Sequence, residues 1–221
     1  MVASHQQLQA EHGLHDRGRD RVKPHNLRRS VFHAGSGIAW ALVYEHVFDR
    51  PQMLLALACF LVLFVTDDIM RRWFPDRRSQ AAVAMFRLLS RPSESGKIAS
   101  STWYTLGLII GVLTLPDHAF LLGVLVLALA DPAAALVGRR FGRRRLYRDK
   151  SVVGSAAFFT VAFVIAAVII AMRFPGLSAT AWLGSAAVIA ATGTVAELLG
   201  GHVQDNVSIP VATGAVTALL L

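Results

Sequence analysis

One carboxylate stands out chemically, because Asp131 lies inside the apolar run LLGVLVLALADPAAALVG and is followed by Pro132. A carboxylate near hydrocarbon is costly and tends to mark function. Proline has no N–H to donate and disrupts a helix, and a carboxylate beside exposed carbonyls at a helix break is a recurring ion or substrate site in membrane proteins. We therefore predict a helix break with a functional Asp131. The alternative is a structural kink with a snorkelling aspartate.

Residues suited to phosphate binding follow Asp131. Small residues let phosphates approach backbone N–H groups, lysine holds a phosphate as a point charge, and serine caps a following helix. Residues of these types, with neighbouring arginines, are Gly138, Arg139, Arg140, Gly142, Arg143, Lys150, Ser151 and Gly154. Their spacing differs from the GxxxxGK[ST] of a P-loop. Glycines four residues apart are equally a helix-packing pattern, so both interpretations stay open.

Other carboxylates are interleaved with arginine and lysine in the polar segments and at the ends of the apolar ones. They are Asp67, Asp68, Asp76, Glu94, Asp149, Glu197 and Asp205. A site for Mg²⁺ and a polyphosphate needs this mixture: oxygen ligands for a hard cation, and guanidinium or ammonium groups for phosphate oxygens. The alternative is that these carboxylates are salt-bridge partners of the basic segments.

The amino-acid composition is that of a membrane protein, so these residues must be positioned by membrane-spanning elements. Of the 221 residues 54% are hydrophobic and 16% are charged, and the mean hydropathy is +0.51. Soluble domains carry about a quarter charged residues, so a soluble enzyme or a secreted scaffold is excluded. The single cysteine, Cys59, lies in an apolar run and excludes a disulfide framework and cysteine-based metal sites.

Apolar segments predict an all-α integral membrane protein with about seven transmembrane helices. The segments are 31–48, 52–69, 101–115, 118–138, 154–172, 179–199 and 207–221. We expect residues 1–30 to form a mobile basic cytoplasmic tail and residues 31–221 to form a single polytopic domain. The stretch from Arg71 to Ser100 includes AAVAMFRLLS, for which we predict a helix lying along the membrane surface.

Charge placement sets the orientation. Of the 22 lysines and arginines, 20 lie in residues 1–30, 70–100 and 139–153, and the other two are Arg50 and Arg173. Because lysine and arginine accumulate in short cytoplasmic loops, we place these segments and residues 200–206 inside, with the C-terminus outside. The net charge of +8 thus indicates orientation rather than nucleic-acid binding. We expect a multi-pass cell membrane protein whose active site faces the cytoplasm.

Several stretches resemble the CTP-dependent lipid kinases, a family that includes dolichol kinase, phytol kinase and the CTP-dependent diacylglycerol kinase. DPAAALVGRRFGRRRLYRDKSVVGSAAFF resembles the family pattern D-x-x-A-x-x-x-G-x-x-x-G, a basic stretch and K-[ST]-x-E-G. The other similar elements, in the family order, are NLRRSVFHAGSG, RPSESGKIASSTWYTLG and AELLGGHVQDNVSIPV. Two departures are Val153, where the family has Glu, and Ser100 or Ser101, where it has Gly.

The resemblance implies roles for individual residues. Asp131, Asp205 and Glu197 are the expected ligands of Mg²⁺ or another divalent cation, and Asn206 contacts the nucleotide. Lys150 with Arg139, Arg140 and Arg143 would clamp the phosphates. Glu197 or His33, which lies one helical turn after Arg29, would take the proton of the lipid hydroxyl. Glu94 is a further candidate, because its inner segment precedes Trp103.

We therefore expect a kinase that transfers the γ-phosphate of CTP to a lipid alcohol. Isoprenoid alcohols such as polyprenol, dolichol or phytol are the leading substrates, with diacylglycerol close behind. A cytidylyltransferase that forms a CDP-lipid, as CDP-diacylglycerol synthase does, is the alternative enzyme, and a small transporter is the alternative of another class. The expected partners are the lipid alcohol, CTP and membrane lipids, with a homo-oligomer possible and no nucleic acid.

Overall fold

A computed structural model describes residues 24–74, 98–148, 150–200 and 205–221, with side chains from residue 30 onward. Its helices are α2 (Pro24–His46), α3 (Arg50–Trp73), α5 (Ser100–Thr114), α6 (Asp117–Phe141), α7 (Val152–Arg173), α8 (Ala179–Leu199) and α9 (Asp205–Leu220). Each apolar segment of the sequence coincides with one of these helices. In lipid a helix satisfies every backbone group internally, so long apolar segments have no other stable form.

Four of the described helices, α3, α6, α7 and α8, are long and apolar enough to cross a membrane. Helices α5 and α9 have only 15 and 16 residues, below the ~20 that a bilayer core requires. The all-α membrane class is confirmed, whereas seven complete crossings and their orientation remain predictions.

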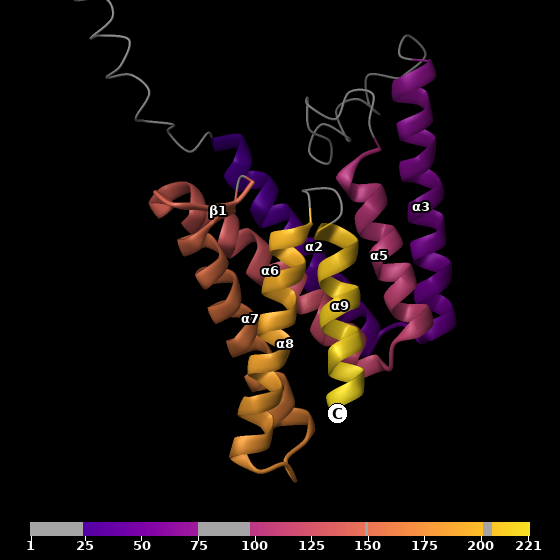
Figure 1. Ribbon diagram of the computed structural model, residues 1–221. Coiled ribbons are helices and arrows are strands. Elements are labelled where there is room, and N and C mark those ends of the chain that lie inside the picture. Colours follow the sequence, from indigo (N-terminus) through magenta and orange to yellow (C-terminus); the bar gives the residue numbers. More distant parts are fainter. Residues whose placement is uncertain (1–23, 75–97, 149, 201–204) are drawn as a thin grey trace, which may run out of the picture.

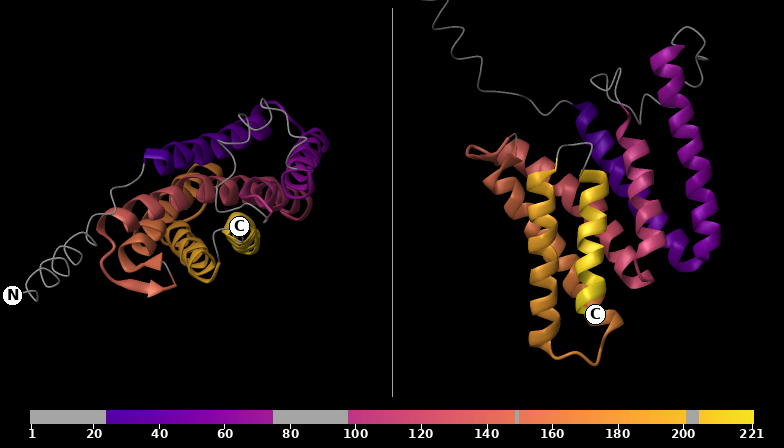
Figure 2. Two further views of the ribbon diagram at one scale, coloured as in Figure 1. Left: turned by 90° about the horizontal axis from the view of Figure 1, so that it is seen from above. Right: turned by 45° about the vertical axis from the view of Figure 1, so that its right-hand side comes forward.

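Successive helices run up and down, so that chain segments far apart in sequence meet at the same end of the bundle (Figure 1). We call this the polar end: it holds the end of α6, the start of α7, the end of α8 and the start of α9. The C-terminus lies at the opposite end (Figure 1). Helix α6 contacts α2, α5, α7 and α9 and forms the centre, whereas α3 lies at the edge beyond α5 (Figure 2).

Two expectations about the polar end were wrong in detail. The tail was expected to extend to residue 30, but α2 begins at Pro24. The segment 139–153 was expected to be a loop, but α6 continues to Phe141, and β1 (Arg145–Tyr147) pairs antiparallel with β2 (Lys150–Ser151). Beside this hairpin the Val152 N–H, which the first turn of α7 leaves free, donates to the carbonyl oxygen of Arg144 at 3.2 Å.

The predicted helix break at Asp131 was also wrong, because α6 runs through Pro132 without interruption. Proline within a helix removes one donor, here the N–H that would reach the carbonyl of Ala128 four residues earlier. Such prolines are tolerated in membrane helices whose neighbours support them. Asp131 is therefore a half-buried residue on a continuous central helix.

Close contacts between helices depend on glycine. A Cβ at Gly37 of α2 would lie 2.5 Å from the Cβ of Ala128, and one at Gly123 of α6 would lie 2.4 Å from the carbonyl oxygen of Pro210. In contrast, a Cβ at Gly35 would meet no atom of a neighbouring helix within 4 Å in the described part of the chain. Small residues at crossings let helix backbones approach in apolar surroundings.

This contrast predicts opposite effects of two substitutions on α2. Gly37→Ala should destabilise the bundle by about 1–3 kcal/mol, because the methyl group must push α2 away from α6. Gly35→Ala should leave stability unchanged or raise it by up to about 1 kcal/mol, since alanine is the better helix former. Thermal unfolding in detergent measures both. Equal melting temperatures for the two variants would contradict the described packing of α2.

Candidate functional site

A buried ion cluster joins three chain segments at the polar end. The ammonium Nζ of Lys150 lies 2.6 Å from Oε1 of Glu197 and 2.9 Å from Oδ2 of Asp205. The side chain of Lys150 is 14% exposed, and each carboxylate side chain is 4% exposed. The Ser155 hydroxyl donates to the other Glu197 oxygen at 3.4 Å. We call Lys150, Glu197 and Asp205 the lysine cluster.

Electrostatics keep this lysine charged. Burial by itself lowers the pKa of Lys150, but the charges and hydrogen bonds of Asp205 and Glu197 outweigh it and raise the pKa above its ordinary value. The ammonium therefore stays protonated at neutral pH and ties β2 to the end of α8 and the start of α9.

The cluster carries more negative than positive groups. Two carboxylates face one ammonium, and Asp131 acts on Asp205 electrostatically as well. The second Asp205 oxygen, Oδ1, is buried and has no hydrogen-bond partner within the described residues. Buried excess charge of one sign is costly, so such a site takes up a proton or a cation.

The glycines after Asp131 serve helix packing. A Cβ at Gly138 would meet the Ser151 hydroxyl at 2.9 Å, and one at Gly154 would lie 3.0 Å from the carbonyl oxygen of Ala134. A Cβ at Gly142 would lie 2.5 Å from the same hydroxyl. Protein atoms thus occupy the space beside these glycines, which favours the packing interpretation over direct phosphate contact. Ser151 accepts a hydrogen bond from the Gly154 N–H, so the predicted cap of α7 is confirmed.

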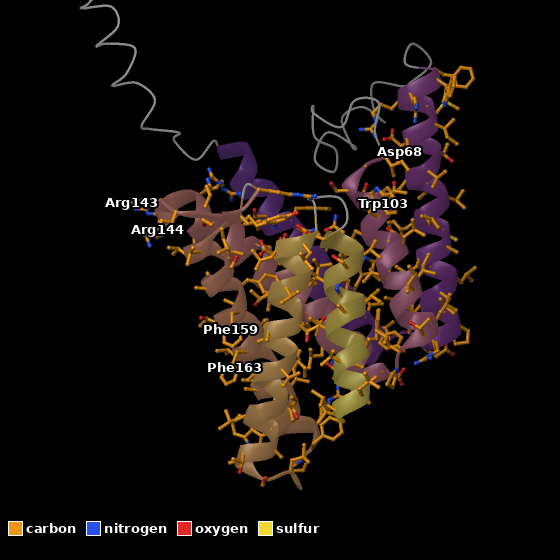
Figure 3. The ribbon with its side chains drawn as sticks, in the orientation of Figure 1. Asp68, Trp103, Arg143, Arg144, Phe159 and Phe163 are labelled. Carbon is orange, nitrogen blue, oxygen red and sulfur yellow. The ribbon has the colours of Figure 1, made fainter. Side chains whose placement is uncertain are left out.

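The predicted phosphate clamp does not converge on the lysine cluster. Arg139, Arg140 and Arg143 are exposed, and the Arg140 guanidinium lies over the ring of Phe141. Figure 3 shows Arg143 with Arg144 at the outer edge of the polar end, on the α7 side and away from α9. These arginines lie on the exposed surface of the polar end rather than in the cluster itself.

Asn206 and Asp68 hold the start of α5. The Asn206 amide donates to the carbonyl oxygen of Ser100 at 3.1 Å. Asp68 of α3 accepts from the N–H of Ala99 and, at 2.7 Å, from the Thr102 hydroxyl, and it pairs with Arg71. In the sequence Asp68 is one of several similar carboxylates. Its partner could not be predicted, because Ala99 lies 31 residues further along the chain.

His33 lies at the level of Asp131. Helix α2 runs antiparallel to α6, since Tyr44 reaches Asp117 and Gly37 meets Ala128. Continuing this register by one helical turn brings His33 to about the height of Asp131 along α6. Its ring meets the ring of Tyr104 edge-on, with centroids 5.0 Å apart. Sequence reasoning assigned Tyr104 no role, because an aromatic residue near a segment end is more often part of an interfacial belt.

Several candidates lie elsewhere. Glu94 falls outside the described residues, and so does the side chain of Arg29. Val153 is 40% exposed while Gly154 and Ser155 next to it are buried, so a side chain at position 153 lies on the exposed face of α7. Within the described part of the chain, no three His, Cys, Asp or Glu residues are grouped as a metal site.

The lysine cluster generates a stability prediction. Lys150→Ala leaves the buried carboxylates of Glu197 and Asp205 without their counter-ion and should cost about 3–5 kcal/mol. Adding Glu197→Gln and Asp205→Asn to that variant should restore much of the loss. Arg148→Ala, an exposed residue of the same hairpin, is the control. If Lys150→Ala and Arg148→Ala unfold at the same temperature in detergent, the cluster does not hold these segments together.

Comparison with known proteins found curated relatives. The chain is 29% identical over 150 residues to CTP-dependent diacylglycerol kinase 1 of Saccharomyces cerevisiae. The aligned part covers 66% of this chain and 50% of the relative. It is 38% identical over 98 residues to the probable chloroplastic phytol kinase of Triticum aestivum, covering 41% of this chain and 33% of the relative. An uncharacterized protein of Rickettsia prowazekii is 26% identical over 84% of this chain and 89% of its own length.

The relatives named for an activity confirm the resemblance to the CTP-dependent lipid kinases. The chain spans about half the length of the diacylglycerol kinases that it matches. No family model and no solved structure matches it.

Proposed function

We propose that this protein transfers the γ-phosphate of CTP to the hydroxyl group of a membrane lipid, at the polar end of the bundle. The observation that carries the proposal is the lysine cluster: a buried, charged group at the end of apolar helices, within electrostatic reach of Asp131 and anchored on an arginine-rich hairpin. The names of the curated relatives supply the nucleotide and the kind of acceptor.

In this reaction the lipid oxygen attacks the γ-phosphorus and the bond to the β,γ-bridging oxygen breaks. CDP leaves, and the hydroxyl proton passes to a base. Such transfer depends on positioning and on neutralising the triphosphate. The exposed arginines of the polar end, Arg139, Arg140 and Arg143, would attract the triphosphate. His33, at the level of Asp131, would accept the proton. Glu197 is the less suitable base, because both its oxygens already have partners.

The carboxylates of the polar end suit the divalent cation that the resemblance implies. Mg²⁺ prefers oxygen ligands, and it usually takes one or two carboxylates together with substrate phosphates. Asp205 has a buried oxygen without a partner in the described chain, and Asp131 lies within electrostatic reach of it. These two residues would hold the cation, which would neutralise phosphate charge. Glu197 joins them less readily than expected, because Lys150 binds it.

We place the acceptor in the leaflet that borders the polar end, which the excess of basic residues assigns to the cytoplasmic side of the cell membrane. The exposed apolar side chains of the spanning helices, such as Leu55, Val62 and Val164, suit a lipid environment. Isoprenoid alcohols remain the leading substrate class and diacylglycerol the second, since the relatives are named for phytol and for diacylglycerol.

The alternative from another class, a transporter, would need charges along a path to the opposite end. At that end the charged groups bind each other: Glu45 pairs with Arg173, and Arg50 pairs with Asp117 at 2.7 Å. The Tyr44 hydroxyl also donates to Asp117, at 2.6 Å. This arrangement favours a closed end over a conducting path.

The decisive experiment measures which phosphate of CTP is transferred to the lipid. Purified protein in detergent with lipid alcohols is given CTP labelled at either the α or the γ phosphate. The kinase proposal expects γ label in the lipid and α label left in CDP. Label from the α position in the lipid indicates the cytidylyltransferase instead, and the absence of both labels from every lipid tested contradicts an enzyme.

Asp131→Asn tests the place of the reaction. It keeps the shape of the side chain but removes its charge, so γ transfer should fall about 100-fold or more, as when one charged group at a reacting phosphoryl is lost. The matched control is Asp117→Asn at the other end of α6, which removes the charge that strengthens the bonds from Tyr44 and Arg50. That control should unfold at a lower temperature yet keep its rate at 25 °C. Similar rates for both variants would remove Asp131 from the site.

A further inference from the structure

Tyr104 carries a buried hydroxyl that the packing of the bundle does not use. The residue lies in α5 and is 7% exposed, and its hydroxyl has no hydrogen-bond partner among the described residues. Ser36 lies beside it and its hydroxyl donates to the carbonyl oxygen of His33 at 2.9 Å, but the two hydroxyl groups are not within hydrogen-bonding geometry of each other. A buried polar group left unpaired costs about 1–3 kcal/mol, and phenylalanine of the same shape would avoid that cost.

The other buried tyrosine of the bundle shows the contrast. Tyr44 is 8% exposed, and its hydroxyl donates to Asp117 at the end away from the lysine cluster. The hydroxyl group of Tyr44 therefore has a structural role, the hydrogen bond to Asp117. Tyr104 has none within the described chain, which points to a ligand.

The Tyr104 side chain lies where α5 meets α2 and α6. The His33 ring lies edge-on to the Tyr104 ring, and a Cβ at Gly37 would come within 3.2 Å of the hydroxyl oxygen. Ala128 packs against Gly37, and Pro132 denies the Ala128 carbonyl its usual helical donor. Asp131 follows Ala128 by about one turn on the same side of α6.

Tyr104 is also linked to the lysine cluster through α9. One turn further along α5, a Cβ at Gly107 would lie 2.5 Å from the backbone oxygen of Asn206, the neighbour of Asp205. The hydroxyl thus lies in the part of the bundle between His33 on α2 and the start of α9. The first turns of α5, which carry Tyr104, therefore pack against the start of α9, which carries Asp205.

We propose that the Tyr104 hydroxyl, together with the His33 side chain, forms the subsite that holds the acceptor hydroxyl of the lipid alcohol. Tyr104 hydrogen-bonds the alcohol oxygen, and His33 takes the alcohol proton as the bond to phosphorus forms. This inference rests on the proposed lipid-alcohol substrate and adds the residues that recognise it.

The test replaces each tyrosine of the chain by phenylalanine. Tyr104→Phe should lower kcat/KM for the lipid alcohol about tenfold or more, the equivalent of one hydrogen bond of about 1.4 kcal/mol, while KM for CTP stays within about twofold. Its melting temperature should stay equal or rise, because an unpaired hydroxyl is removed. Tyr44→Phe should do the opposite, with a lower melting temperature and unchanged kinetics, and exposed Tyr147→Phe should change neither.

A binding measurement separates this inference from the proposed reaction. Geranylgeraniol should raise the melting temperature of the wild type in detergent more than the same isoprenoid chain without the hydroxyl group does, because the hydrocarbon has no oxygen to accept a hydrogen bond from Tyr104. Tyr104→Phe should lose that difference, and Tyr44→Phe should keep it. If this pattern holds without γ transfer, the subsite stands and the kinase proposal fails. If the wild type does not distinguish the alcohol from the hydrocarbon, or if Tyr104→Phe matches it in both assays, the subsite is refuted.

Discussion

The polar end depends on one interaction, the pairing of a buried ammonium with two buried carboxylates. Lys150 comes from a strand, Glu197 from the end of α8 and Asp205 from the start of α9, and none of them would be stable there without the others. Because the three groups fix each other, the helix ends around them are fixed too. The reaction we propose takes place beside a rigid charged anchor instead of in a flexible loop.

Two kinds of contact hold the helices together: close packing at glycines and contacts between charged or polar side chains. In the middle of the bundle, Gly37 and Gly123 let α2 and α9 approach the central helix closely. At the far end, Tyr44 and Arg50 converge on Asp117 and close the bundle. At the polar end the same close packing continues through Gly138 and Gly154, so the glycines that resembled a phosphate site instead let α6 and α7 approach each other.

Much of the fold could be predicted because hydropathy acts locally. Each apolar segment became a helix, and the cap at Ser151 followed from residue type alone. The partners of Lys150 could not be predicted in this way, since they lie 47 and 55 residues further along the chain and meet it only through tertiary packing. The break expected at Pro132 failed because neighbouring helices support a proline that would end an isolated helix. Tyr104 was missed because burial of a hydroxyl has no signature in sequence.

The central claim is that CTP binds at the polar end, beside the lysine cluster. Hydrogen exchange measured by mass spectrometry, with and without CTP and Mg²⁺, tests it without requiring turnover. The account predicts slower exchange in peptides that contain the starts of α7 and α9 and the end of α8, with no change around Asp117 and Arg50. Unchanged exchange at the polar end, or protection confined to the opposite end, would contradict it.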